Sequence, residues 1–155
     1  MRYLRLVVIG ALLGLGLSTI IKVYSTFPLA CAAVYRFDTT VNVGKSLLTA
    51  EIANNDAQRT KGLSGRQCIG ANQAMLFVFD RPDYYPFWMK DMNFPIDIIW
   101  IDANHHVVTV KSNVNPSTYP QSFVNSNPAQ YVIEIKAGRA QALGITNGTL
   151  IKFNQ

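Results

Sequence analysis

Residues 96–110 read IDIIWIDANHHVVTV, and this stretch decides the fold class. Two runs rich in β-branched and aromatic residues, 96–101 and 106–110, flank the tetrapeptide DANH. Aspartate and asparagine favour turns, and β-branched and aromatic residues favour strands. The pattern therefore predicts a β-hairpin.

The first strand of this hairpin is apolar on both of its faces. Side chains alternate along a strand, so Asp97 shares a face with Ile99, while Ile98 and Trp100 occupy the other. A strand of this kind is expected to be buried on both sides.

Similar short runs recur along the rest of the chain, at 46–54, 74–79, 130–135 and 149–153. Segments rich in Asn, Asp, Gly and Pro separate them. Two segments favour helix instead. Residues 57–61 follow possible N-cap residues and precede Gly62, and residues 137–145 read AGRAQALGI. We predict a mainly β (α+β) fold, a compact antiparallel sheet or small barrel with one or two short helices.

The N-terminal segment has the three parts of a secretory signal. Arg2 and Arg5 precede an apolar run at 6–21, and the small residues of ACAA follow at 30–33. Cleavage after Ala32 and retention as an inner-membrane anchor are both compatible with this length. We therefore expect residues 1–33 to be a signal peptide or anchor, and residues 34–155 to be one globular domain that is exported to the periplasmic side.

The positive charge belongs mainly to this segment. The formal net charge is +5, and it falls to +2 when Arg2, Arg5 and Lys22 are left out. The remaining basic residues are scattered, which argues against a nucleic-acid partner. The expected partner is an unknown envelope ligand or protein, with membrane contact only through the N-terminal segment.

The two cysteines do not indicate a metal site or a redox motif. Cys31 and Cys68 could form a disulfide if the N-terminal segment is retained, whereas cleavage after Ala32 would leave Cys68 alone. A soft-metal site would have to combine Cys68 with Met75, Met89 and Met92, a spacing that is not a recognised ligand pattern. We predict no metal and no cofactor.

Several segments together resemble a known family. RTKGLSGR, MLFVF, FWMKDMNFPIDIIWID, NPAQYVIEI and AGRAQALGI occur in the order and spacing of the prokaryotic domain of unknown function 192 family. The resemblance covers about Lys45 to Phe153. It implies a small β-rich fold, frequently behind a signal sequence, with no established activity. The chain departs from the family pattern at Asp91, where Asn is usual, and at Ala74, where Gly is usual.

A candidate binding site follows from the segment FWMKDMNFPID at 87–97. A carboxylate at the start of a buried strand needs a partner, so we expect Asp97 to pair with Lys90, Arg59 or Arg66. This pair could simply fix the strand crossing.

The tetrapeptide FWMK suggests how a ligand could be held. If it is extended, Trp88 and Lys90 share one face, and Phe87 and Met89 share the other. Trp88 could then form an aromatic wall, and Lys90 with Arg59 or Arg66 could bind an anionic or hydroxylated group. Burial of Trp88 in the core is the alternative interpretation.

Signs of catalysis are few. His105 and His106 lie in the predicted turn and are best explained as solvated residues. Asp91 and Asp97 could form a carboxylate pair for hydrolysis. Without a nucleophile and base, we expect a non-catalytic binding or interaction module, with an envelope hydrolase or a purely structural accessory domain as alternatives.

Overall fold

The computed structural model describes residue 31 and residues 35–154. The strands are β1 (Thr39–Val43), β2 (Ser46–Ala53), β3 (Gln73–Asp83), β4 (Phe87–Trp88), β5 (Ile96–Ile101), β6 (Val107–Val114), β7 (Ser122–Phe123), β8 (Ala129–Lys136) and β9 (Ile151–Phe153). The helices are α1 (Asp56–Lys61), α2 (Arg139–Ala142) and the 3-10 turn η2 (Pro116–Thr118).

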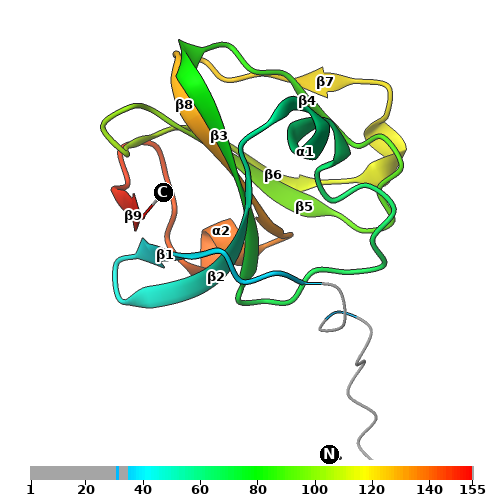
Figure 1. Ribbon diagram of the computed structural model, residues 1–155, viewed down its shortest axis with the longest axis horizontal. Coiled ribbons are helices and arrows are strands. Elements are labelled where there is room, and N and C mark those ends of the chain that lie inside the picture. The colour runs from blue at the N-terminus through cyan, green and yellow to red at the C-terminus, as the bar shows by residue number, and fades with distance from the viewer. Residues whose placement is uncertain (1–30, 32–34, 155) are drawn as a thin grey trace, which may run out of the picture.

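Seven of the strands form one curled sheet in the order β6-β5-β8-β3-β2-β1-β9. Neighbouring strands are antiparallel except β2 and β3, which are parallel and are connected through α1. The sheet curls until its two edges touch, at a bridge between His106 and Leu150. Figure 1 shows β9 lying beside β1, with α1 on the same side of the molecule as β4 and β7. The mainly β prediction is confirmed, and the sheet is a half-barrel.

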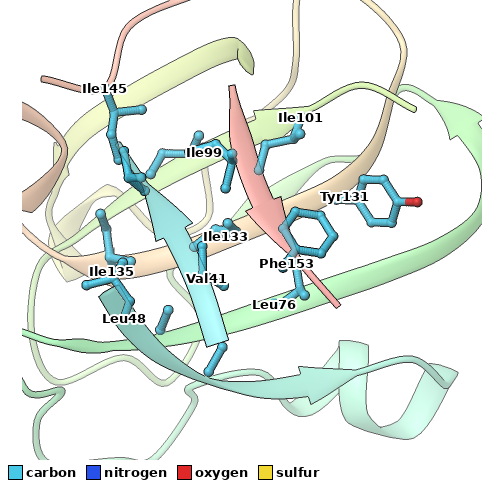
Figure 2. Close-up of a cluster of buried hydrophobic side chains, with 14 of the residues drawn as sticks. Val41, Leu48, Leu76, Ile99, Ile101, Tyr131, Ile133, Ile135, Ile145 and Phe153 are labelled. Carbon is cyan, nitrogen blue, oxygen red and sulfur yellow. The ribbon is translucent and has the colours of Figure 1, made fainter. Parts of the chain in front are cut away.

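The curled sheet separates two apolar cores. One lies inside the curl and contains Val41, Leu76, Ile99, Ile133 and Phe153 (Figure 2). Because side chains alternate along strands, the neighbouring residues of β3, β5 and β8 point to the opposite face. There a second core forms.

The second core lies outside the curl and includes Phe77, Phe87, Met89, Ile98 and Trp100. All six residues of β5 are buried, so the predicted two-sided burial of this strand is confirmed. The hairpin of β5 and β6 is confirmed as well.

Both predicted helices are present and end as their sequences indicate. The Asn55 side chain caps α1 by accepting a hydrogen bond from Gln58 N at 3.0 Å, and α1 ends before Gly62, whose φ is +46°. Likewise, α2 is followed by Gly144 with φ of +66°. Left-handed backbone favours glycine, so these two positions stop the helices.

A disulfide joins Cys31 to Cys68, with the two Cα atoms 5.4 Å apart. The pairing that the sequence left open is therefore formed, and Cys68 is not available as a metal-binding thiolate. Apart from Cys31, the predicted signal or anchor at residues 1–33 lies outside the described residues. Within residues 35–154 no helix is long and apolar enough to span a membrane.

Candidate functional site

A cavity of about 210 Å³ opens into the second core between α1 and β4. Part of its wall is aromatic: Phe77 and Phe79 from β3, Phe87 and Trp88 from β4, and Tyr85 from the segment between these strands. Phe77 and Phe87 meet edge to face with ring centres 4.8 Å apart, and Phe79 stacks on Tyr85. Phe77 and Phe79 share a face because side chains alternate along β3, whereas β4 belongs to the separate two-stranded sheet with β7.

Glu134 is the only carboxyl group among the described residues that line this cavity. It lies on β8 and is 5% exposed. Its Oε2 atom is buried and has no hydrogen-bond partner within the described part of the chain. Burial raises the pKa of Glu134 from its ordinary 4.5 to about 8, and the positive charge of Arg66 acts in the opposite direction. At neutral pH the Glu134 carboxyl group is therefore mostly protonated.

A second buried carboxyl, Glu51, lies in the same row of the sheet. Met75 on β3 is the register partner of both Glu51 on β2 and Glu134 on β8. With about 4.8 Å between neighbouring strands, the two glutamates are roughly 10 Å apart. Unlike Glu134, Glu51 forms a bidentate ion pair with Arg66, in which Arg66 Nη2 donates to Glu51 Oε2 at 2.9 Å. The hydrogen bond to Glu51 raises the pKa of Arg66.

Arg59 lies at the edge of the cavity, and its guanidinium group already has partners. Its Nη1 donates to the carbonyl oxygen of Val78 at 2.8 Å, and its Nη2 forms an ion pair with Asp56 at 2.7 Å. The guanidinium carbon also lies 5.3 Å from the centre of the Phe79 ring. Arg59 therefore holds α1 against β3 and contributes little free positive charge.

Trp88 stands at the rim of the cavity with half of its surface exposed. Phe87 and Met89 are buried, whereas Lys90 is exposed. The predicted alternation of FWMK is confirmed, and the interpretation of Trp88 as a core residue is wrong. Trp88 projects outward because Phe87 and Met89 fill the second core from the opposite face of the same short segment.

An outer pocket of about 470 Å³ adjoins the cavity and shares with it Thr60, Lys61, Ser64 and Trp88. Lys90 and Asp91 line only the outer pocket. Among the described residues, neither Lys61 nor Lys90 forms an ion pair. The outer pocket therefore presents two ammonium groups that have no ion-pair partner among the described residues. It also contains the carboxylates of Asp91 and Asp56, and Asp56 is paired with Arg59.

Asp91 has a role in the backbone of this pocket. Its φ is +56°, a left-handed conformation that Asn and Asp adopt more readily than most residues. Its carbonyl oxygen accepts a hydrogen bond from Gly65 N at 2.7 Å, and Ser64 Oγ donates to the Lys90 carbonyl at 2.9 Å. These bonds join the turn at 90–91 to the turn after α1. Asp91 differs from the Asn that is usual in the family, and both residue types suit this conformation.

Asp97 lies away from the cavity, and the prediction of a cationic partner is wrong. Its side chain is fully buried and accepts three backbone hydrogen bonds, from Asn113 N at 2.8 Å, Gly138 N at 3.1 Å and Ala140 N at 2.8 Å. Three N–H donors replace the cation that the carboxylate was expected to need. Within residues 35–154 it forms no ion pair with Lys or Arg.

The same geometry bears on the proposed carboxylate pair. Asp91 is exposed in the outer pocket, whereas Asp97 is at 0% exposure on the face of β5 that contacts α2. The two carboxyl groups therefore do not face a common open cleft, which a pair acting on a glycosidic bond would require. Residues 35–154 also contain no cluster of three or more potential metal ligands of the His, Cys, Asp and Glu types.

Of the ligand-binding candidates named from the sequence, the structure brings Trp88, Lys90 and Arg59 to the two adjoining pockets. Arg66 lines neither of these two pockets and is paired with Glu51. Sequence reasoning missed Glu134. The available signal was an acidic residue inside the apolar run YVIEI, where each neighbour favours burial.

Comparisons with known proteins agree with this fold. The model of the family DUF192, described as "Uncharacterized ACR", matches residues 39–153. A crystal structure of a protein of unknown function from Novosphingobium aromaticivorans DSM 12444 is similar, with 28% identity and a TM-score of 0.69, over 83% of this chain and 99% of that one. A Sinorhizobium meliloti 1021 protein, provisionally described as a transcription regulator, has 26% identity and a TM-score of 0.69, over 74% and 91%. No curated protein matches the chain.

Proposed function

The chain belongs to the DUF192 family, and we propose that this member is a non-catalytic module of the cell envelope that binds a small ligand in the cavity between α1 and β4. One observation carries the proposal: the buried Oε2 of Glu134 lacks a partner in a cavity with aromatic walls. A buried polar atom without a hydrogen bond costs about 1–3 kcal/mol. A ligand that supplies the missing bond would recover that energy.

The form of the cavity supports binding of a small molecule. Binding sites of this kind combine apolar and aromatic walls with a few polar groups that fix orientation. Here Glu134 is the polar group inside, and Trp88 is an exposed aromatic at the entrance. The volume of about 210 Å³ is equivalent to about seven water molecules, so it suits one end of a small molecule.

Placement in the envelope is supported by two features. The N-terminal segment has the three parts of a secretory signal, and the disulfide between Cys31 and Cys68 is of a kind that persists in oxidising compartments. A nucleic-acid ligand, which the description of the Sinorhizobium meliloti protein would suggest, is not favoured. The basic residues of this chain are scattered along the sequence.

The two tryptophans provide a direct test. Trp88 is half exposed at the rim, whereas Trp100 is fully buried and donates from Nε1 to the Tyr85 carbonyl at 2.9 Å. A bound ligand should shield Trp88 from a soluble quencher such as acrylamide and leave Trp100 unaffected. We expect compounds that raise the melting temperature in a screen of glycans, amines, peptides and metal ions to reduce quenching as well.

The variant Trp88→Ala should weaken binding of such compounds about fivefold or more, because we expect this aromatic contact to contribute about 1–3 kcal/mol. Tyr84→Ala is the matched control, since Tyr84 is equally exposed and lines neither pocket. Equal affinities for both variants and the wild type would contradict the site. If no compound both stabilises the protein and shields Trp88, the domain is a structural accessory and the proposal fails.

A further inference from the structure

The two adjoining pockets have opposite chemical character. The inner cavity holds the carboxyl group of Glu134 among aromatic rings, and the outer pocket carries Lys90, while Lys61 lines both. Neither lysine has an ion-pair partner within the described residues. Trp88 also lines both pockets. We infer that the ligand is a zwitterion, with an ammonium group beside Glu134 and an anionic group beside Lys61 and Lys90. This inference rests on the proposed function of the cavity.

The inner end favours an ammonium group for two reasons. An N–H donor on the ligand would satisfy Glu134 Oε2 through a charge-assisted hydrogen bond, which is stronger than a neutral one. Phe77, Phe87 and Trp88 line this cavity, and aromatic rings attract cations through their quadrupoles. The nearby guanidinium groups compete little for Glu134, because Arg59 is paired with Asp56 and Arg66 with Glu51.

The outer end favours an anion. Lys90 stands on the exposed face beside Trp88, and the ammonium nitrogen of Lys61 lies over the turn at Gly65, 3.5 Å from the position of a Cβ there. Asp91 and Asp56 line the same pocket, and Asp56 is paired with Arg59. The anionic group would be oriented toward the lysines and away from these two carboxylates. Charge of opposite sign at the two ends fixes the direction in which the ligand binds.

The experiment uses the full-length protein and ω-amino acids of three to eight carbons, with n-alkylamines and n-alkanoates of equal length as single-charge controls. Affinities are measured by calorimetry and by shielding of Trp88 from acrylamide. We expect an optimum length at which the amino acid binds more tightly than both the amine and the alkanoate. The length series also measures the spacing between the two charge sites.

Variants separate the two ends. Glu134→Gln keeps the shape of the side chain. It should lower the affinity for the amino acids and alkylamines about tenfold or more, and should not change the affinity for the alkanoates. Lys90→Met changes a residue that lines only the outer pocket, so it should weaken binding of the amino acids and alkanoates and leave binding of the alkylamines unchanged. Asp80→Asn and Lys45→Met are the matched controls, because both residues are exposed and line neither pocket.

A measurement on the unmodified protein tests the same inference even if these variants misfold. An ammonium ligand binds the ionised carboxylate, so its affinity should rise about tenfold for each pH unit between 6 and 7.5 and level off above the Glu134 pKa of about 8. Each binding event should release a proton at pH 7. The other charged groups around Glu134 are Glu51 on β2, Arg59 and Lys61 on α1, Arg66 in the following loop, and Tyr85, whose own pKa is raised by burial.

The outcomes for the ligand class and for the site can be told apart. If the amino acids and amines do not bind, while another compound shields Trp88 in a Glu134-dependent way, the zwitterion inference falls and the binding site stands. Affinity for amines that is independent of pH between 6 and 7.5 would also overturn the inference. If no compound shields Trp88, both proposals fail together.

Discussion

Glu134 links the stability of the protein to pH at the scale of a single residue. Its pKa is about 8 in the folded protein and about 4.5 when unfolded, so the folded state holds its proton more tightly. The resulting stabilisation is fully present below pH 4.5. It is lost as pH rises through the interval from 4.5 to 8, because the unfolded chain ionises first.

Replacing Glu134 by Gln should remove this dependence. We expect the free energies of unfolding of the variant and the wild type to be similar near pH 4.5. At pH 9 the variant should be more stable, by up to about 3–5 kcal/mol. Urea denaturation at a series of pH values measures the difference, with Asp80→Asn as the control. Parallel pH profiles for Glu134→Gln and the wild type would contradict the raised pKa.

The residues of the site were predictable to different degrees. Trp88 and Lys90 could be assigned to one face because alternation is a local property of extended chain. The hydrogen-bond partners of Asp97 could not be predicted, because its three N–H donors come from the end of β6 and the start of α2, far away in the sequence. Glu134 was missed because its importance depends on a cavity formed by α1 and β4.

At the scale of elements, Asp97 is the residue that joins β5 to β6 and α2. One carboxylate oxygen binds the amides of Asn113 and Gly138, and the other binds Ala140. Asn113 and Gly138 both have positive φ, at +53° and +80°, so the carboxylate stabilises two turns in the left-handed region. No other described acidic side chain has three backbone donors of this kind.

The variant Asp97→Asn should therefore destabilise the fold. An amide side chain offers one acceptor oxygen and would turn its NH₂ group toward at least one backbone N–H. We expect a loss of about 2–4 kcal/mol in the free energy of unfolding. Affinity for any ligand of the cavity should be unchanged in protein that remains folded, because Asp97 does not line the cavity. Thermal melting with a binding assay checks both points, and loss of binding in folded Asp97→Asn would contradict this assignment.

The longer elements could be predicted, and the shortest could not. Strands β2, β3, β5, β6 and β8 each contain at least six residues and show the alternation or apolar run on which prediction depends. In contrast, β4 and β7 contain two residues each and exist because they pair with each other over the second core. β1 was missed because TTVNV reads as weakly patterned, with only Val41 and Val43 buried.

At the scale of the whole molecule, the disulfide joins the segment that precedes β1 to the loop between α1 and β3. It closes a loop with a sequence separation of 37, which in the chain-entropy account stabilises the folded state by about 3–4 kcal/mol. We expect the double variant Cys31→Ser with Cys68→Ser to lose that amount in urea denaturation. Adding a reductant should destabilise the wild type similarly and leave the double variant unchanged. If reductant has no effect on the wild type, the bond is not formed in the isolated protein.

The meeting of the sheet edges at His106 and Leu150 also constrains the order in which the protein can be assembled. The strand that completes the sheet, β9, begins at Ile151, whereas its partner β1 ends at Val43. During synthesis, the outer edge of β1 therefore stays uncovered until β9 has been made. A nascent chain that lacks β9 has an incomplete inner core, which delays stable folding until this strand is available.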